Sequence, residues 1–147
     1  MNNVPWWAFA AASALAASVI PVIAKLGLRS VNSDLATVVR SLVMAVVLIL
    51  FASATNVWSS WHTLREGGTK ALVCLVSTGI AGALSWIFYF KALQAGEAAR
   101  VVPLDKLSVP FAVVLAVIVL GERPSVVNWI GIGLAVVGIV LATLPAR

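Results

Sequence analysis

Five long apolar stretches constrain this chain more than any other feature of its sequence. Each reaches the roughly 17 to 25 residues that an α-helix needs to cross a bilayer. Only 10% of the residues are charged, against roughly a quarter in soluble proteins, and the mean hydropathy is +1.08. The sequence therefore predicts an all-α membrane bundle of five transmembrane helices, forming one domain over residues 1–147. The stretches cover residues 6–28, 35–53, 70–93, 98–120 and 126–144.

Several function classes lack support in this sequence. Cys74 is the lone cysteine and His62 the lone histidine, so no disulfide and no metal site is predicted. Cys74 is expected in the packed core. No nucleophile elbow, HExxH motif or P-loop is present, which argues against an enzyme. The net charge of +5 comes without a basic run, so we expect no nucleic-acid partner. No cofactor is expected either.

Charges outside the apolar stretches predict a membrane orientation by a narrow margin. With five spans, one side of the membrane carries five cations and the other side three. The positive-inside rule places the five-cation side in the cytoplasm and the N-terminus outside. So small a difference also leaves dual insertion open. The richer side holds Lys25, Arg29, Lys91, Arg100 and Arg147, and the other side holds Arg65, Lys70 and Arg123.

The fourth apolar stretch carries the pattern that points most directly to function. An adjacent acid and base, Asp105 and Lys106, lie between Pro103 and Pro110. Proline removes a backbone donor and kinks a helix, and ionisable groups at membrane depth are costly unless they line a cavity or a packed interior. We expect kinks at Pro103 and Pro110, with a further kink at Pro21 in the first stretch. The segment is interpreted as part of a transport pathway or its wall.

Spans two and three contain further candidates for contact with a solute. Arg40 lies about one and a half turns into span two, and Trp86, Tyr89 and Phe90 follow the i, i+3, i+4 spacing of one helix face in span three. The polar edges of Trp and Tyr need partners inside a membrane, so Trp86 and Tyr89 are candidates for ligand contact and Phe90 is assigned to the core. Small residues are expected at close helix contacts, among them Gly79, Gly82, Gly131, Gly133 and Gly138.

The charged residues allow two interpretations. In the first, Arg40 and Lys106 attract an anionic or zwitterionic group into a polar chamber, and Asp105 is a counter-ion or a proton acceptor. In the second, Arg40 reaches toward the membrane surface, or pairs with Asp105 to hold span two against span four. Both interpretations stay open at this level.

Short motifs along most of the chain resemble one membrane family. They are KLGL at 25–28, DLATVVR at 34–40, SW at 85–86, YFKALQAG at 89–96, VPLDKLS at 102–108 and LGERP at 120–124. In order and spacing they resemble the EamA-like domain of the drug/metabolite transporter superfamily. The resemblance implies a five-helix half-transporter that typically occurs as two tandem inverted copies around a central cavity. This chain holds one copy, so we expect it to associate with a second copy of itself, and an antiparallel pair suits the narrow charge margin.

Together these features predict a secondary transporter of a small polar or amphipathic metabolite. It would work as an exporter or exchanger, by alternating access as a homodimer, in a bacterial or archaeal plasma membrane. Its partners would be membrane lipid, the solute and the second copy. Two alternatives stay open: a membrane subunit that does not transport, and a carrier of lipid-linked anions.

Overall fold

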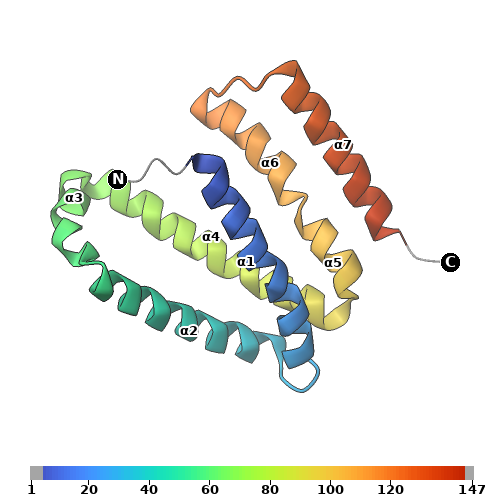
Figure 1. The fold of residues 1–147 in the computed structure, drawn as a ribbon, viewed down its shortest axis with the longest axis horizontal. Helices are drawn as coiled ribbons and strands as arrows, with labels where there is room; N and C mark the ends of the chain where they lie inside the picture. Colours follow the sequence, from blue (N-terminus) through green and yellow to red (C-terminus); the bar gives the residue numbers. More distant parts are fainter. Residues whose placement is uncertain (1–4, 145–147) are drawn as a thin grey trace. The chain divides into compact units, whose positions relative to one another are not determined.

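A computed structural model describes residues 5–144, and this part of the chain is helical, without a β-strand. Figure 1 shows the succession of helices. The elements are α1 (Trp6–Gly27), α2 (Ser33–Ala54), η1 (Val57–Ser60), α3 (Trp61–Glu66), α4 (Gly68–Ala95), α5 (Ala98–Asp105), α6 (Ser108–Leu115), η2 (Ala116–Leu120) and α7 (Val126–Thr143). The segment η2 is π-helical.

Five helical segments within residues 5–144 are long and apolar enough to cross a membrane. They are α1, α2, α4, the stretch Ala98–Leu120 and α7. Each corresponds to one of the apolar stretches found in the sequence, so the predicted all-α fold class with five spans is confirmed. The fourth span differs from a simple rod, because α5 ends at Asp105 and α6 begins only at Ser108.

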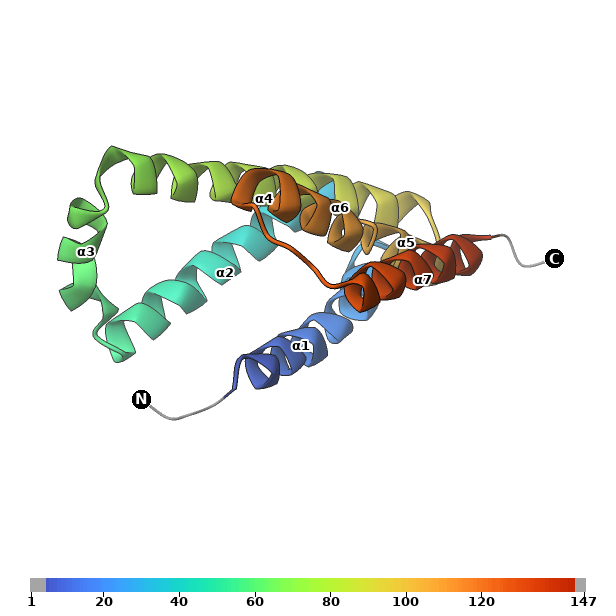
Figure 2. The same ribbon diagram turned by 90° about the horizontal axis from the view of Figure 1, so that it is seen from above.

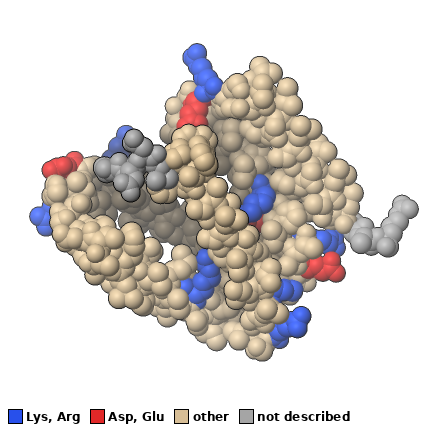
Figure 3. Space-filling model, in the orientation of Figure 1, with Lys and Arg blue, Asp and Glu red and all other residues tan. Residues whose placement is uncertain are grey.

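The surface of the described chain is mostly apolar. On the face drawn in Figure 3, Lys, Arg, Asp and Glu side chains form small separate patches in a surface of other residues. Apolar side chains such as Leu50, Phe88 and Ile118 are exposed along the spans. Water would penalise so large an apolar surface, whereas lipid tails accept it. The helices therefore contact membrane lipid.

The chain divides into two compact units. The central unit, residues 27–94, contains α2, η1, α3 and nearly all of α4. Within this unit α2 and α4 meet at one end and diverge toward α3, as the views in Figures 1 and 2 both show. The unit is thus a V of two antiparallel membrane helices.

Polar side chains hold the closed end of this V. The Asn32 side chain accepts a hydrogen bond from the Asp34 backbone N–H at 2.8 Å and caps the start of α2. From α4, the Gln94 Oε1 atom accepts from the Ser33 N–H at 3.2 Å, and its Nε2 atom donates to the Val31 carbonyl at 3.1 Å. The first two bonds satisfy N–H groups that the start of a helix leaves unpaired, and the third satisfies a carbonyl of the connection before α2. Leu93, next to Gln94, is fully buried.

The terminal unit contains α1, α5, α6, η2 and α7. Two basic side chains tie its elements together at backbone carbonyls: the Lys25 ammonium donates to the Gly96 carbonyl at 2.6 Å, and Arg100 Nε donates to the Thr143 carbonyl at 3.0 Å. A cation beside the C-terminus of α7 also suits the helix dipole. At the other end, Gly121 has a φ of +70° and closes η2 in the left-handed conformation that glycine adopts without strain.

One sequence expectation about packing was wrong, and another is not met within either unit. Cys74 is exposed on α4 rather than placed in the core, as a small apolar side chain can be when lipid is the solvent. A Cβ added at any of the five glycines expected at helix contacts would meet no atom of the same unit within 4 Å. Packing within a unit therefore does not explain them, and a close contact with another helix stays a prediction. These positions are Gly79, Gly82, Gly131, Gly133 and Gly138.

Candidate functional site

Arg40 and Trp86 lie against each other where α2 faces α4. The Arg40 guanidinium carbon is 3.4 Å from the centroid of the Trp86 ring and 5.9 Å from the centroid of Phe90. Such stacking over an indole face is a strong form of the cation–π interaction. It covers one face of the guanidinium while leaving its N–H edge in the plane where a carboxylate or phosphate binds.

The central unit supplies no carboxylate to Arg40. The carboxylates of this segment are Asp34 and Glu66. Asp34 pairs with Lys91 at 3.2 Å, and Glu66 closes α3, outside the long helices. The Arg40 guanidinium thus lies inside a transmembrane helix without an acidic partner from its own unit.

Three aromatic rings on α4 form the wall beside Arg40. Trp86 contacts Tyr89 and Phe90 edge to face, with ring centroids 5.4 Å and 5.8 Å apart. Phe90 is buried, as its assignment to the core predicted, whereas Trp86 and Tyr89 are half-buried. The stripe thus has a packed end and an accessible end.

In the terminal unit, Asp105 and Lys106 lie at the interruption of the fourth span. The Lys106 ammonium donates to Asp105 Oδ2 at 3.2 Å. The Asp105 side chain is 34% exposed and that of Lys106 57%. Each charge therefore has its sequence neighbour as partner, and both remain accessible.

Proline chemistry explains why the helix is interrupted at this position. In a continuous helix the Lys106 carbonyl would accept from the N–H of residue 110, but Pro110 has none and its ring crowds that carbonyl. The Lys106 carbonyl instead accepts from the Val109 N–H at 3.0 Å. On the other side of the gap, the Lys106 and Leu107 N–H groups bond three residues back, to Pro103 and Leu104, at 3.0 Å and 3.1 Å. Between α5 and α6 the backbone therefore forms tight turns, with hydrogen bonds between groups three residues apart.

The structure brings the predicted site residues together in pairs. Arg40 and Trp86 are in contact in the central unit, and Asp105 and Lys106 are in contact in the terminal unit. An ion pair between Arg40 and Asp105 stays a prediction. Pro21 is buried inside α1, which runs without interruption from Trp6 to Gly27.

A cleft between α2 and α4 is a site that the sequence reasoning missed. It encloses about 590 Å³. The Asp34–Lys91 ion pair lies at one end, and two hydroxyls and four aliphatic side chains complete the lining. We call it the α2–α4 cleft; its residues are Asp34, Thr37, Val38, Ser41, Leu42, Ala83, Ile87 and Lys91. The sequence could have suggested this cleft, because the start of span two and the end of span three must lie on the same side of the membrane.

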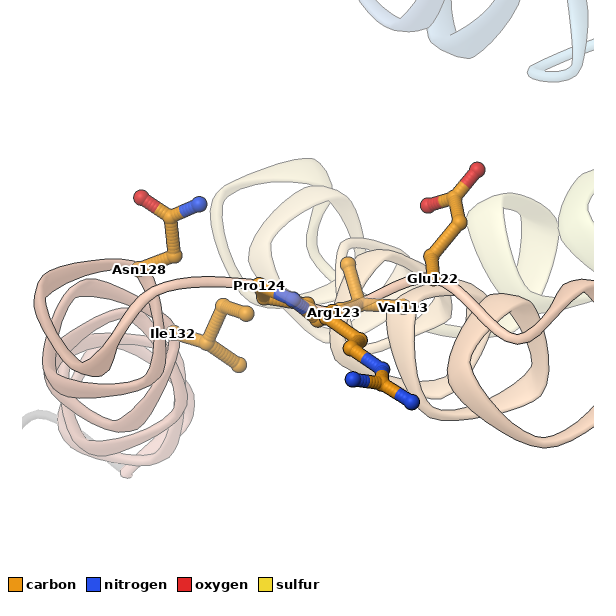
Figure 4. Close-up of a pocket in the computed structure, with 6 residues that line it drawn as sticks. All are labelled: Val113, Glu122, Arg123, Pro124, Asn128 and Ile132. Carbon is orange, nitrogen blue, oxygen red and sulfur yellow. The ribbon is translucent and has the colours of Figure 1, made fainter.

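A second pocket, of about 430 Å³, lies beside the connection between η2 and α7. Figure 4 shows that the Glu122 and Arg123 side chains point away from this connection in opposite directions. Within the described chain no ion pair joins them. The other lining residues are Val113, Pro124, Asn128 and Ile132. In residues 5–144 no group of His, Cys, Asp and Glu side chains is arranged to hold a metal ion.

Comparison with known proteins gives one family. The model of the EamA-like transporter family matches residues 4–144. A protein from Sinorhizobium sp., described as an uncharacterized transporter in the cobO 3' region, is 37% identical over 136 residues, which are 92% of this chain and 94% of that protein. No solved structure matches the chain. With its five membrane-crossing segments, the chain therefore belongs to the EamA-like transporter family and is a multi-pass transporter of the cell membrane.

Proposed function

We propose that this protein exports or exchanges a small polar or amphipathic metabolite that carries an anionic group, and that Arg40 holds this group. The chain would act as a single EamA-like domain that supplies half of the transport pathway. Transport rather than catalysis is the activity proposed, in line with the family.

The contact between Arg40 and Trp86 carries the proposal. The Arg40 guanidinium carbon lies 3.4 Å from the centroid of the Trp86 ring, a contact that would restrain the guanidinium before a ligand arrives. Orientation in advance lowers the entropic cost of binding. Tyr89, half-buried beside Trp86, would add a ring and a hydroxyl to the same site.

Ligand-induced stabilisation of the purified protein tests this role of Arg40. A ligand that binds only the folded state adds RT ln(1 + [L]/Kd) to the stability. Amphipathic carboxylates and phosphate monoesters would be screened for a rise in melting temperature. We expect Arg40→Lys to abolish the rise, because an ammonium neither stacks on Trp86 nor forks around a carboxylate. Arg65→Lys, in α3, is the matched control and should keep it.

Two outcomes would contradict the proposal. One is a ligand that stabilises Arg40→Lys as much as the unchanged protein. The other is a folded protein that none of these anions stabilises, which would favour a membrane subunit that does not transport.

We further propose that Asp105 and Lys106 couple transport to protons. Their position at the interruption of the fourth span supports this. If the break changed shape, the Asp105–Lys106 ion pair would separate, and the Asp105 carboxylate could then accept a proton. Uptake into liposomes would be measured across a range of pH. Asp105→Asn should flatten the dependence on pH, and an unchanged dependence would remove Asp105 from the coupling role.

A dimer is the proposed working state, with two antiparallel copies that together form the pathway. The Sinorhizobium relative is matched over 94% of its own length, so it too carries one copy of the domain. Transporters of this architecture use two related halves around a site near the midplane. The contact-free glycines on α7 are consistent with a surface that packs on another chain.

A further inference from the structure

The α2–α4 cleft changes from polar to aliphatic along the helices that form it. Asp34 lies in the first turn of α2, and Lys91 lies near the C-terminal end of α4. Thr37 and Ser41 follow on α2, and Leu42 lies about 12 Å along the axis from Asp34, at about 1.5 Å per residue. The charged end therefore sits near the membrane surface, and the aliphatic part lies deeper. A molecule that fits this order has a charged head and an apolar tail.

The charged end of the cleft can offer a ligand both a hydrogen-bond acceptor and hydrogen-bond donors. The ion pair joins Lys91 Nζ to Asp34 Oδ1, which leaves a second carboxylate oxygen and further ammonium protons for a ligand. Both side chains are more than half exposed, so the ion pair itself contributes little and can be rearranged cheaply. A head group with one positive and one negative charge complements this pair, whereas a purely anionic or cationic head would meet a like charge.

The middle and the deep end of the cleft fit an aliphatic tail. The Thr37 and Ser41 hydroxyls donate to the carbonyls of Ser33 and Thr37, both at 2.8 Å, so their oxygens present acceptors only. Val38, Leu42, Ala83 and Ile87 line the rest. The volume of about 590 Å³ is within the usual range of sites for small molecules, roughly 300 to 1,000 Å³.

This cleft is separate from the Arg40 site. At about 100° per residue, Arg40 and Asp34 lie on either side of Thr37 around α2, and Thr37 is buried. On α4, Trp86 and Lys91 likewise lie on either side of the buried Phe90 around the helix axis. One side of the V thus carries the Arg40–Trp86 contact and the other side the cleft.

From this arrangement we propose that the α2–α4 cleft binds a zwitterionic amphiphile. Its ammonium group would lie on Asp34, its phosphate or carboxylate on Lys91, and its aliphatic tail along Val38, Leu42 and Ile87. Two sources supply this chemistry: a phosphatidylethanolamine from the bilayer, or a free aliphatic amino acid. The proposal does not depend on the transport role of Arg40.

Titration of the purified full-length protein in detergent tests the proposal and separates the two sources. The probes are dihexanoyl-phosphatidylethanolamine, dihexanoyl-phosphatidylglycerol, which lacks the ammonium, and leucine. We expect the first or the third to raise the melting temperature, and phosphatidylglycerol to be at least tenfold weaker, as the loss of a charge-assisted hydrogen bond implies. Binding of phosphatidylethanolamine alone assigns a lipid, and binding of leucine alone assigns a free solute.

Adjacent residues on α2 provide a matched pair of variants. Leu42 and Val43 are 63% and 57% exposed, but only Leu42 lines the cleft. Leu42→Trp should fill the tail region and weaken binding about tenfold or more, while Val43→Trp should leave binding unchanged. If Leu42→Trp does not fold, Asp34→Asn serves in its place and should remove the preference for an ammonium head group.

Clear results would overturn the assignment. Equal binding of phosphatidylglycerol and phosphatidylethanolamine would show that the Asp34–Lys91 pair does not select the head group. Binding that Leu42→Trp and Val43→Trp weaken equally would place the ligand elsewhere. No binding of any of the three probes to the folded protein would refute the proposal, and it would leave the test of Arg40 unaffected.

Discussion

At the scale of one residue, the Gln94 side chain shows how a membrane protein pairs backbone groups that lie outside its helices. Its amide accepts from the Ser33 N–H and donates to the Val31 carbonyl, so a single side chain serves both a donor and an acceptor in the connection between α1 and α2. Unpaired backbone groups are costly away from water. This amide therefore fixes where α2 starts relative to the end of α4.

Gln94→Met keeps the length of the side chain and removes both of these bonds. We expect the free energy of unfolding to fall by about 1 to 3 kcal/mol, the cost of leaving a partly buried backbone group unpaired. Denaturation of the purified protein in mixed micelles measures this change. Ser77→Ala is the control, because the Ser77 hydroxyl bonds only the Val73 carbonyl of its own helix. Equal stability of the two variants would argue against the role given to Gln94.

At the scale of the element, sequence and structure agree on which residues form helices. Apolar length alone predicts each span, because lipid forces every backbone group of a crossing segment to bond within it. The register of α2 against α4 was not predictable. Ser33 with Gln94, Asp34 with Lys91, and Arg40 with Trp86 are successive contacts of one antiparallel pair. Hydropathy carries no information about such pairings, so the sequence singled out Arg40 and Trp86 without joining them and missed the cleft.

The interruption between α5 and α6 can be removed by one substitution. Pro110→Ala restores an N–H that the Lys106 carbonyl can accept, which favours a continuous helix through this point. We expect amide hydrogen exchange around residues 107–111 to slow about tenfold, if the restored bond contributes about 1.4 kcal/mol, and transport to slow as well. Pro124→Ala, in the connection before α7, is the control. Unchanged exchange in Pro110→Ala would show that other contacts maintain the break.

At the scale of the whole molecule, lipid accounts for the exposed apolar surface, and the proposed second copy would cover part of it. Substitution of glycines on α7 can tell whether lipid or a second copy of the chain covers this helix. Gly131 and Gly138 are seven residues apart and share a face, while Gly133 lies on the other side of the helix. Close helix pairs in membranes form at such small-residue faces.

Gly131→Leu should weaken self-association of the protein by about tenfold, since a side chain there keeps the two backbones apart. Gly133→Leu should leave it unchanged. Neither substitution meets an atom of its own unit within 4 Å of the new Cβ, so both variants are expected to fold. Crosslinking in native-like bilayers over a range of protein-to-lipid ratios measures the effect. Equal loss in both variants would rule out this face as the contact.

The break at Lys106 also has a mechanical consequence. Beyond it, α6 and η2 form an arm from Ser108 to Leu120, roughly 20 Å long at about 1.5 Å per residue. A rotation of only ten degrees at the break, in round numbers, would swing the tip of this arm by roughly 3.5 Å, more than half the pitch of an α-helix. If the break bends during transport, a small rearrangement of Asp105 and Lys106 would therefore be magnified at the far end of the fourth span.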